Sequence, residues 1–183
     1  MLTIPTSYLR AALYHVSREG KRPGLWGVNI RAINRSVVIS ATNGTSAFIS
    51  KIVRNDDQTY TFSVTIPTEF VKCVLALHKR AVTLDVNIAA QRIADMQYTP
   101  IDAQYPDINS IIPRSIDVTA LRPARLDPAL ALAAHKSMVE ISNDYHVYQR
   151  NDASTVYMHS SGNAMCLVMP MRTKDLPPFS WSF

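Results

Sequence analysis

The chain has 183 residues, and its 47% hydrophobic and 18% charged residues suffice for a folded core, which excludes a disordered polypeptide. The formal net charge of +5 favours a polyanionic partner, most commonly nucleic acid, although a mildly basic protein without such a partner would carry the same charge. No apolar run reaches the roughly 18 residues of a membrane span, the first residues lack the basic region of a signal peptide, and Cys73 and Cys166 form no CxxC pair, so we expect a cytoplasmic protein with reduced thiols and no membrane partner.

In chain order, the first predicted helix opens a pattern that returns twice. Residues 4–13 (IPTSYLRAAL) and 66–75 (IPTEFVKCVL) are identical or similar at nearly every position, and residues 126–134 (LDPALALAA) form a weaker third copy. The proline of each copy suits the first turn of a helix, where its missing N–H needs no partner. Apolar residues then recur at helical spacing. They are Leu9, Leu13 and Val16 in the first copy and Phe70, Val71, Val74 and Leu77 in the second.

Short segments of alternating hydrophobicity follow each predicted helix and predict antiparallel strands. Turn-forming pairs such as Asn43-Gly44 separate them. The predicted strands span residues 25–33, 37–42 and 47–53 after the first helix, 81–88 and 92–99 after the second, and 144–150, 155–160 and 164–169 after the third. The sequence therefore predicts an α+β fold of three repeated helix-plus-strand units, with helices covering one face of a sheet.

Three stretches of the sequence resemble the bacterial DNA polymerase III beta subunit, the DNA sliding clamp. YPDINSIIP at 105–113 resembles the aromatic-Pro-Asp…Pro segment that closes a clamp domain, and LVMPMR at 167–172 resembles the C-terminal signature of the clamp. ATNG at 41–44 resembles the Ala-Thr-Asp-Gly turn of the middle domain, and LWGV at 25–28 resembles the strand before that turn. The resemblance implies a DNA-clamp fold in which residues 1–113 form a complete domain of two units, 114–172 form half a domain, and 173–183 form a C-terminal tail.

The chain also departs from the clamp pattern. Thr45-Ser46-Ala47 stand where clamps usually have His-Arg-Leu, and eleven residues follow Arg172, where clamps usually end. Three units are predicted where a clamp subunit has six, and the charge is positive where clamps are usually acidic.

Basic residues lie on the side of each predicted helix that faces away from its apolar residues. In the clamp this side faces the duplex, so the resemblance implies sequence-independent contacts between these residues and the phosphates of double-stranded DNA. An ordinary solvated helix face is the alternative. The candidate DNA-facing residues are Arg10, Lys21, Lys72, Lys79 and Lys136.

The resemblance further implies an apolar cleft that binds short peptides of replication proteins. Methionine suits such a cleft because its flexible side chain adapts to different peptides, but the same residues could also be ordinary core. The tail is a candidate occupant, because Leu176 and Phe179 have the three-residue spacing found in clamp-binding peptides. One wall of the cleft consists of Leu25, Thr42, Gly44 and Ala47, and the other of Val168, Met169, Pro170 and Met171.

No motif of catalysis stands out. The five histidines show no metal-ligand spacing, and no P-loop, GxGxxG or GxSxG occurs, so we predict neither an enzyme nor a cofactor. We predict instead a DNA-associated, homo-oligomeric, clamp-like protein that tethers replication proteins through the cleft. The alternative is a decoy or adaptor with the same fold that binds replication proteins without encircling DNA.

Overall fold

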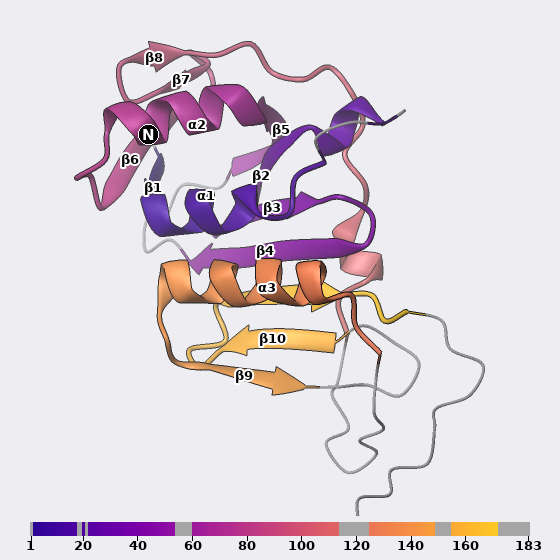
Figure 1. Cartoon of the computed structure of the whole chain (residues 1–183). Coiled ribbons are helices and arrows are strands. Elements are labelled where there is room, and N and C mark those ends of the chain that lie inside the picture. Colours follow the sequence, from indigo (N-terminus) through magenta and orange to yellow (C-terminus); the bar gives the residue numbers. More distant parts are fainter. Residues whose placement is uncertain are drawn as a thin grey trace, which may run out of the picture.

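The computed structural model describes residues 2–17, 20, 22–53, 60–113, 125–148 and 155–171. Within them, three helices and two antiparallel sheets form an α+β fold, as predicted (Figure 1). The helices are α1 (Thr6–Leu13), α2 (Thr68–Leu77) and α3 (Pro128–Ile141). The larger sheet has the order β5 (Tyr60–Pro67), β2 (Gly27–Asn34), β3 (Ser36–Thr42), β4 (Ser46–Val53), β11 (Ala164–Val168), β10 (Thr155–His159) and β9 (Tyr145–Tyr148). The smaller sheet has the order β1 (Leu2–Pro5), β6 (Thr83–Asn87), β7 (Arg92–Ile93) and β8 (Met96–Gln97).

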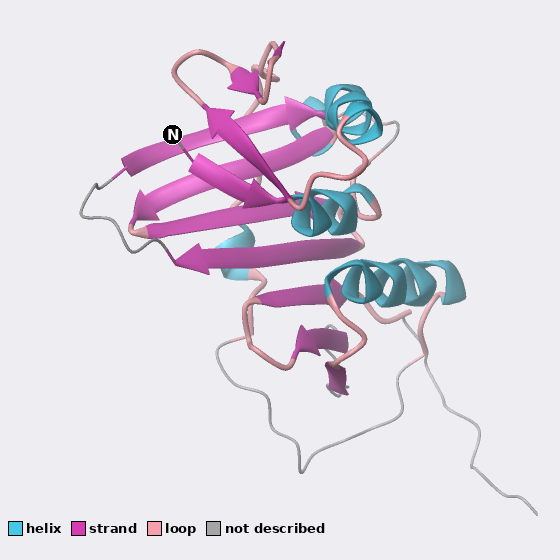
Figure 2. Ribbon diagram, turned by 90° about the vertical axis from the view of Figure 1, so that its left-hand side faces the viewer, coloured by secondary structure: helices cyan, strands magenta, loops and turns pink. Residues whose placement is uncertain are grey.

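The three described helices lie on one side of the seven-stranded sheet, whose strands form the other side of the molecule (Figure 2). None of these helices is long and apolar enough to cross a membrane.

The repeated Ile-Pro-Thr joins two parts of the chain rather than simply opening a helix. Pro5 and Pro67 keep extended backbones and end β1 and β5, so the helices begin one residue later, at the threonines. The N–H and hydroxyl of Thr6 both donate to the carbonyl of Val82, just before β6. Those of Thr68 both donate to the carbonyl of Trp26, just before β2. Each threonine thus fastens its helix to the strand that follows the other helix.

The strands show the same reciprocal exchange: the strand before each of these two helices pairs with the strand that follows the other helix. β1 pairs with β6, with Pro5 opposite Thr83, and β5 pairs with β2, with Pro67 opposite Gly27. In both ladders the proline faces the first residue of its partner strand. The strand before each helix therefore completes the sheet of the other helix. Neither β1 nor β5 was predicted from the sequence.

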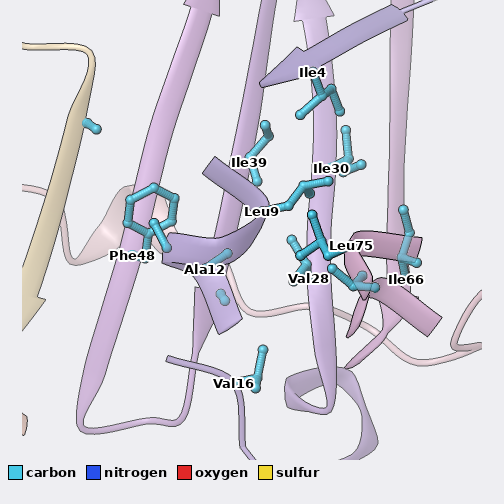
Figure 3. Close-up of a cluster of buried hydrophobic side chains, with 14 of the residues drawn as sticks. Ile4, Leu9, Ala12, Val16, Val28, Ile30, Ile39, Phe48, Ile66 and Leu75 are labelled. Atoms are coloured by element: carbon cyan, nitrogen blue, oxygen red, sulfur yellow. The ribbon is translucent and has the colours of Figure 1, made fainter. Parts of the chain in front are cut away.

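The main core lies between the helices and the inner face of the large sheet (Figure 3). Ile4 and Ile66, the matching residues of the two copies, are both fully buried there, with Leu9 of α1 and Leu75 of α2. Buried apolar side chains of this kind each contribute about 1.5–3 kcal/mol to folding. Leu77, which the helical spacing placed with the core, is instead 66% exposed at the end of α2.

The last part of the chain joins the first through a long-range ladder. β11 pairs with β4 so that Ala47 faces Leu167, and α3 packs against α1. A smaller apolar cluster of Ala47, Ile49, Ile108, Val156 and Leu167 lies on the outer face of this junction. Residues 105–112 cover it, because Ile108 inserts its side chain there from a short 3-10 turn (Ile108–Ser110). This segment, which follows β8, is thus a cover for the outer sheet face.

One predicted strand is divided. Residues 92–99 form β7 and β8, each of two residues, instead of one strand. Gln91 and Ala94 have positive φ angles of 51°, which turn the chain before and after β7 and limit the length of its ladder.

Candidate functional site

An apolar cleft opens on the outer face of the sheet, where β4 and β11 meet. Its cavity measures about 120 Å³. Three separate parts of the chain line it: the turn between β3 and β4, the end of β11, and the segment that follows the 3-10 turn. The lining residues are Thr42, Gly44, Thr45, Ser46, Ala47, Ile111, Leu167 and Met169.

The turn at the cleft is held by the Asn43 side chain. Its carbonyl oxygen accepts hydrogen bonds from the backbone N–H groups of Thr45 (2.9 Å) and Ser46 (2.8 Å). Gly44 supplies a φ of +91°, which residues with a side chain rarely adopt. The N–H of Met169 donates to the carbonyl of Thr45 at 2.9 Å, so the chain beyond β11 lies against this turn.

Strand alternation decides which predicted wall residues reach the cleft. Four of the predicted wall residues line the cleft: Thr42, Gly44, Ala47 and Met169. Leu167, which was not predicted, also lines it, because its side chain lies on the same face as that of Met169. Val168, between these two, points to the helix side and is fully buried in the main core.

The other predicted wall residues lie outside the cleft. Leu25 is buried in a 3-10 turn (Pro23–Leu25), where its carbonyl accepts from the N–H of Ser17. Pro170 and Met171 follow the cleft, and the N–H of Met171 donates to the carbonyl of Arg125 at 2.7 Å. Ile111 was not predicted to line the cleft, although it belongs to the 105–113 segment that carries the resemblance.

Beneath the turn, a buried histidine connects the cleft to α3. The Nδ1 of His15 lies 2.9 Å from the hydroxyl of Ser46, and its Nε2 lies 2.9 Å from the hydroxyl of Ser137. Because the Ser137 hydroxyl donates to the carbonyl of Ala11, it can only accept from His15, so Nε2 carries the proton. In that neutral form Nδ1 accepts from the hydroxyl of Ser46, which also lies 3.4 Å from Oδ1 of Asn43.

Burial lowers the pKa of His15 to about 4. The ring also stacks with Phe48 at a centroid distance of 6.5 Å, and the Cys166 sulfur lies 3.4 Å from Nε2. Burial likewise raises the pKa of the Cys166 thiol, so both groups are uncharged at neutral pH. This cluster holds Ser46, and with it the cleft turn, against the helix layer.

The predicted DNA-facing residues that the structure describes lie on the helices or, as Lys79 does, in the turn after α2. Arg10 on α1 is half-buried and donates to the carbonyl of Lys79 at 3.4 Å, which brings these two residues together. Lys136 is exposed on α3. Lys72 is exposed on α2 but pairs with Glu69 at 2.6 Å, which offsets part of its charge. Lys21 lies outside the described residues.

Comparison with known proteins gives solved structures alone, since no protein-family model and no curated protein sequence matches the chain. The DNA polymerase III beta chain from Streptococcus pneumoniae TIGR4 matches with a TM-score of 0.73 at 14% identity, over 94% of this chain and 64% of its own. A putative DNA polymerase III beta subunit from Eubacterium rectale ATCC 33656 matches with a TM-score of 0.72 at 8% identity, over 94% and 65%. The DNA polymerase sliding clamp from Bacillus subtilis matches with a TM-score of 0.69 at 14% identity, over 94% and 64%.

The chain has the sliding-clamp fold. It spans just under two thirds of the length of these clamps.

Titratable side chains elsewhere form isolated pairs. His78 lies 3.1 Å from Asp95, where hydrogen bonds from its own backbone and from His78 lower the pKa of the aspartate. Asp85 accepts from the hydroxyl of Thr3, and Asp107 accepts from the N–H of Asn109. Among the described residues no three metal-ligating side chains gather at one place.

Proposed function

We propose that the chain is a clamp-like, DNA-associated protein that tethers replication proteins through the cleft at the β4–β11 junction. One observation carries the proposal: the segments 41–44, 105–113 and 167–172, which resemble the clamp in sequence, each contribute lining residues to one apolar cleft on a clamp fold. The role is one of binding, without catalysis and without a cofactor.

The domain organisation belongs to the same proposal. Residues 1–113 make one complete clamp-like domain of two copies of a unit, 114–172 make half a domain from a third copy, and 173–183 make a tail that lies outside the described residues. The matched bonds of Thr6 and Thr68, and the matched registers of Pro5 and Pro67, support two copies related by a two-fold exchange.

The chemistry of the cleft fits an extended peptide with large apolar side chains. Ala47, Ile111, Leu167 and Met169 supply an apolar floor and rim, and Ile111 and Met169 are 47% and 54% exposed. The remaining lining groups are hydroxyls, glycine and backbone, so no charged side chain of the described residues lines the cleft. A bound peptide would therefore gain affinity from buried apolar area and show little dependence on salt.

Binding of a labelled peptide tests the proposal. The probe is the sequence TKDLPPFSWSF, which is the tail of this chain (173–183), and its binding is followed by fluorescence anisotropy with the full chain and with a chain ending at Met171. We expect Met169→Glu and Ile111→Glu each to weaken binding at least tenfold, because a carboxylate cannot be buried unpaired against the peptide. Met171→Glu is the matched control, since Met171 is 44% exposed and does not line the cleft.

Equal binding by the Met169 and Met171 variants, or no binding by either chain length, contradicts the assignment of the cleft. The decoy or adaptor alternative predicts the same peptide result but no binding to duplex DNA. Duplex binding therefore separates a tether on DNA from a decoy.

A further inference from the structure

A second pocket lies on the outer face of the large sheet. Its volume of about 320 Å³ is that of a small-molecule site, for which roughly 300–1,000 Å³ is usual. Strands β2, β3 and β5 form its floor, and residues 104–109 cover it. We name it the outer pocket. Among the described residues none lines both the outer pocket and the β4–β11 cleft, so the two are separate sites.

The floor of the outer pocket contains a row of buried polar side chains. Asn29 on β2 lies opposite Ser40 on β3 and opposite Thr65 on β5, and residues directly opposite each other point to the same side of a sheet. Asn29 is 2% exposed, and its amide donates to Oγ1 of Thr65 at 3.1 Å and to Oγ of Ser63 at 3.2 Å. The row ends at β4, where the apolar Ile49 lies opposite Ser40. The polar character is therefore confined to the part of the sheet under the outer pocket.

The covering segment is held on both sides of Tyr105. Before it, the N–H of Ile101 donates to the carbonyl of Thr65 at 2.9 Å. After it, Ile108 is 7% exposed within the outer apolar cluster, which Tyr105 also contacts. Tyr105 is thus fixed above the sheet, with its phenol directed into a buried position.

Two hydroxyls at the outer pocket are buried without a hydrogen-bond partner in the structure: those of Ser40 and Tyr105. Ser40 is 1% exposed. Burial raises the pKa of Tyr105 to about 12, and the nearby Ser40 hydroxyl offsets part of that rise, but neither hydroxyl makes a hydrogen bond of normal geometry. Buried hydroxyls are rarely left unpaired, because they lose their bonds to water. Both are protonated at neutral pH and can donate to one bound oxygen atom.

A cation lies beside these hydroxyls. Arg31 projects from β2 on the same face as Asn29, and its side chain is 39% exposed. Its guanidinium lies 3.9 Å from the carboxylate of Asp107, which is too far for a hydrogen bond. That carboxylate instead accepts from the backbone N–H of Asn109 at 3.1 Å and from its side-chain amide at 3.0 Å. Arg31 therefore keeps N–H donors for another acceptor.

We propose that the outer pocket binds a small organic carboxylate. One carboxylate oxygen accepts from the hydroxyls of Ser40 and Tyr105, and the other accepts from the guanidinium of Arg31, whose planar fork suits a carboxylate. The organic part of the ligand packs on the apolar lining residues Val38, Pro106 and Ile108. The two unpartnered hydroxyls and the guanidinium carry the proposal, which is independent of peptide binding at the cleft and of DNA binding.

Titration with benzoate tests the proposal on the full chain. Benzoate combines a carboxylate with a flat apolar ring, and benzamide is its uncharged counterpart. In two-dimensional NMR spectra of the 15N-labelled chain, we expect benzoate to shift the amides of residues 29–31 and 104–109 to saturation, with a Kd of about 1 mM. Benzamide should bind at least tenfold more weakly, because it lacks the charge that Arg31 recognises.

Substitutions at the outer pocket identify the contacts. Ser40→Ala and Tyr105→Phe should each raise the Kd for benzoate at least threefold, and Arg31→Gln at least tenfold. Asp107→Asn is the matched control, since it removes a carboxylate that competes for Arg31 and should leave binding as tight or tighter. Without benzoate, Tyr105→Phe should melt no lower than the wild type, because its hydroxyl has no partner to lose.

Several results would overturn the proposal. They are shifts that do not saturate or that map away from residues 29–31 and 104–109, equal binding of benzoate and benzamide, and an unchanged Kd in Ser40→Ala and Tyr105→Phe. A pocket that holds only water would bind neither probe and would overturn it as well. A lower melting temperature of ligand-free Tyr105→Phe would mean that the phenol is paired within the fold, which removes the donor on which the site depends.

Discussion

His15 is buried as a neutral ring between two serine hydroxyls, and this placement makes stability depend on pH. Its pKa is about 4 in the folded chain and about 6.5 in the unfolded one. Above pH 6.5 both states are neutral at this residue, and stability is complete. As the pH falls from 6.5 to 4, the unfolded chain takes up the proton first, so stability is lost across this interval, by about 3 kcal/mol in all.

We therefore expect His15→Gln to remove part of the acid sensitivity. Urea unfolding of the wild type and of the variant at pH 7, 6 and 5 measures it, and the difference in stability between the two should shrink as the pH falls. The carboxylates titrate in both proteins and cancel in this comparison. A difference that stays constant from pH 7 to pH 5 would mean that the folded chain binds a proton at His15 as readily as the unfolded one.

Sequence reasoning could not find this cluster. The sequence showed only that His15 lacks metal-ligand spacing, and its two serine partners lie 31 and 122 residues away along the chain. Serine carries no signal for such a contact, because it is common on surfaces and in turns. The alternation of β11, by contrast, was readable, and it would have placed Leu167 rather than Val168 at the cleft.

At the scale of elements, most strands after the helices were predicted within two residues, and the strands before the helices were missed. β5 did carry a signal, since Tyr60, Phe62, Val64 and Ile66 alternate with polar residues. β1 has four residues and too little pattern to detect. Its partner β6 begins 81 positions after Leu2, so its pairing depends on a contact that local periodicity does not contain.

The ladder between β2 and β5 gives a test at this scale. A Cβ on Gly27 would lie 2.3 Å from the carbonyl oxygen of Ile66, closer than packing allows, so Gly27→Ala should destabilise the fold by about 2–3 kcal/mol. Gly162→Ala is the control: its φ of +70° disfavours alanine, but nothing lies within 4 Å, so we expect a loss of about 1 kcal/mol. Midpoints of urea unfolding compare the two, and an equal loss would mean that the strands separate readily at Gly27.

At the scale of the whole molecule, three motifs far apart in the sequence predicted the clamp fold by their resemblance to clamp segments, and in the structure all three line one cleft. The sequence could not show that β11 pairs with β4, nor that β9 has only β10 beside it among the described strands, since both follow from tertiary pairing. The net positive charge and the basic positions on the helices could be read from the sequence. The pairing of Lys72 with Glu69, however, reduces the positive charge that the helix layer presents.

Duplex binding is the prediction that belongs to this scale. If the helix layer faces DNA, Lys72→Glu with Lys136→Glu should weaken binding to duplexes of any sequence at least tenfold and reduce the log–log salt slope by about 2. Arg31→Glu with Lys51→Glu changes the net charge equally on strands β2 and β4, and should change binding less. Anisotropy titrations from low to high salt provide the measurement. Equal losses in the two variants would point to net charge alone, and absent wild-type binding would favour the decoy.

The pairing of β4 with β11 also determines when this part of the sheet can form during translation. The ribosome releases residues 46–53 long before residues 164–168, with which they pair. β1 is likewise synthesised long before its partner β6. The nascent chain therefore presents the open edge of β4, with apolar Phe48 and Ile49, throughout the synthesis of everything between. Edges of this kind recruit chaperones or aggregate. Slower translation should therefore lengthen the time for which this edge is open to aggregation or to chaperone binding.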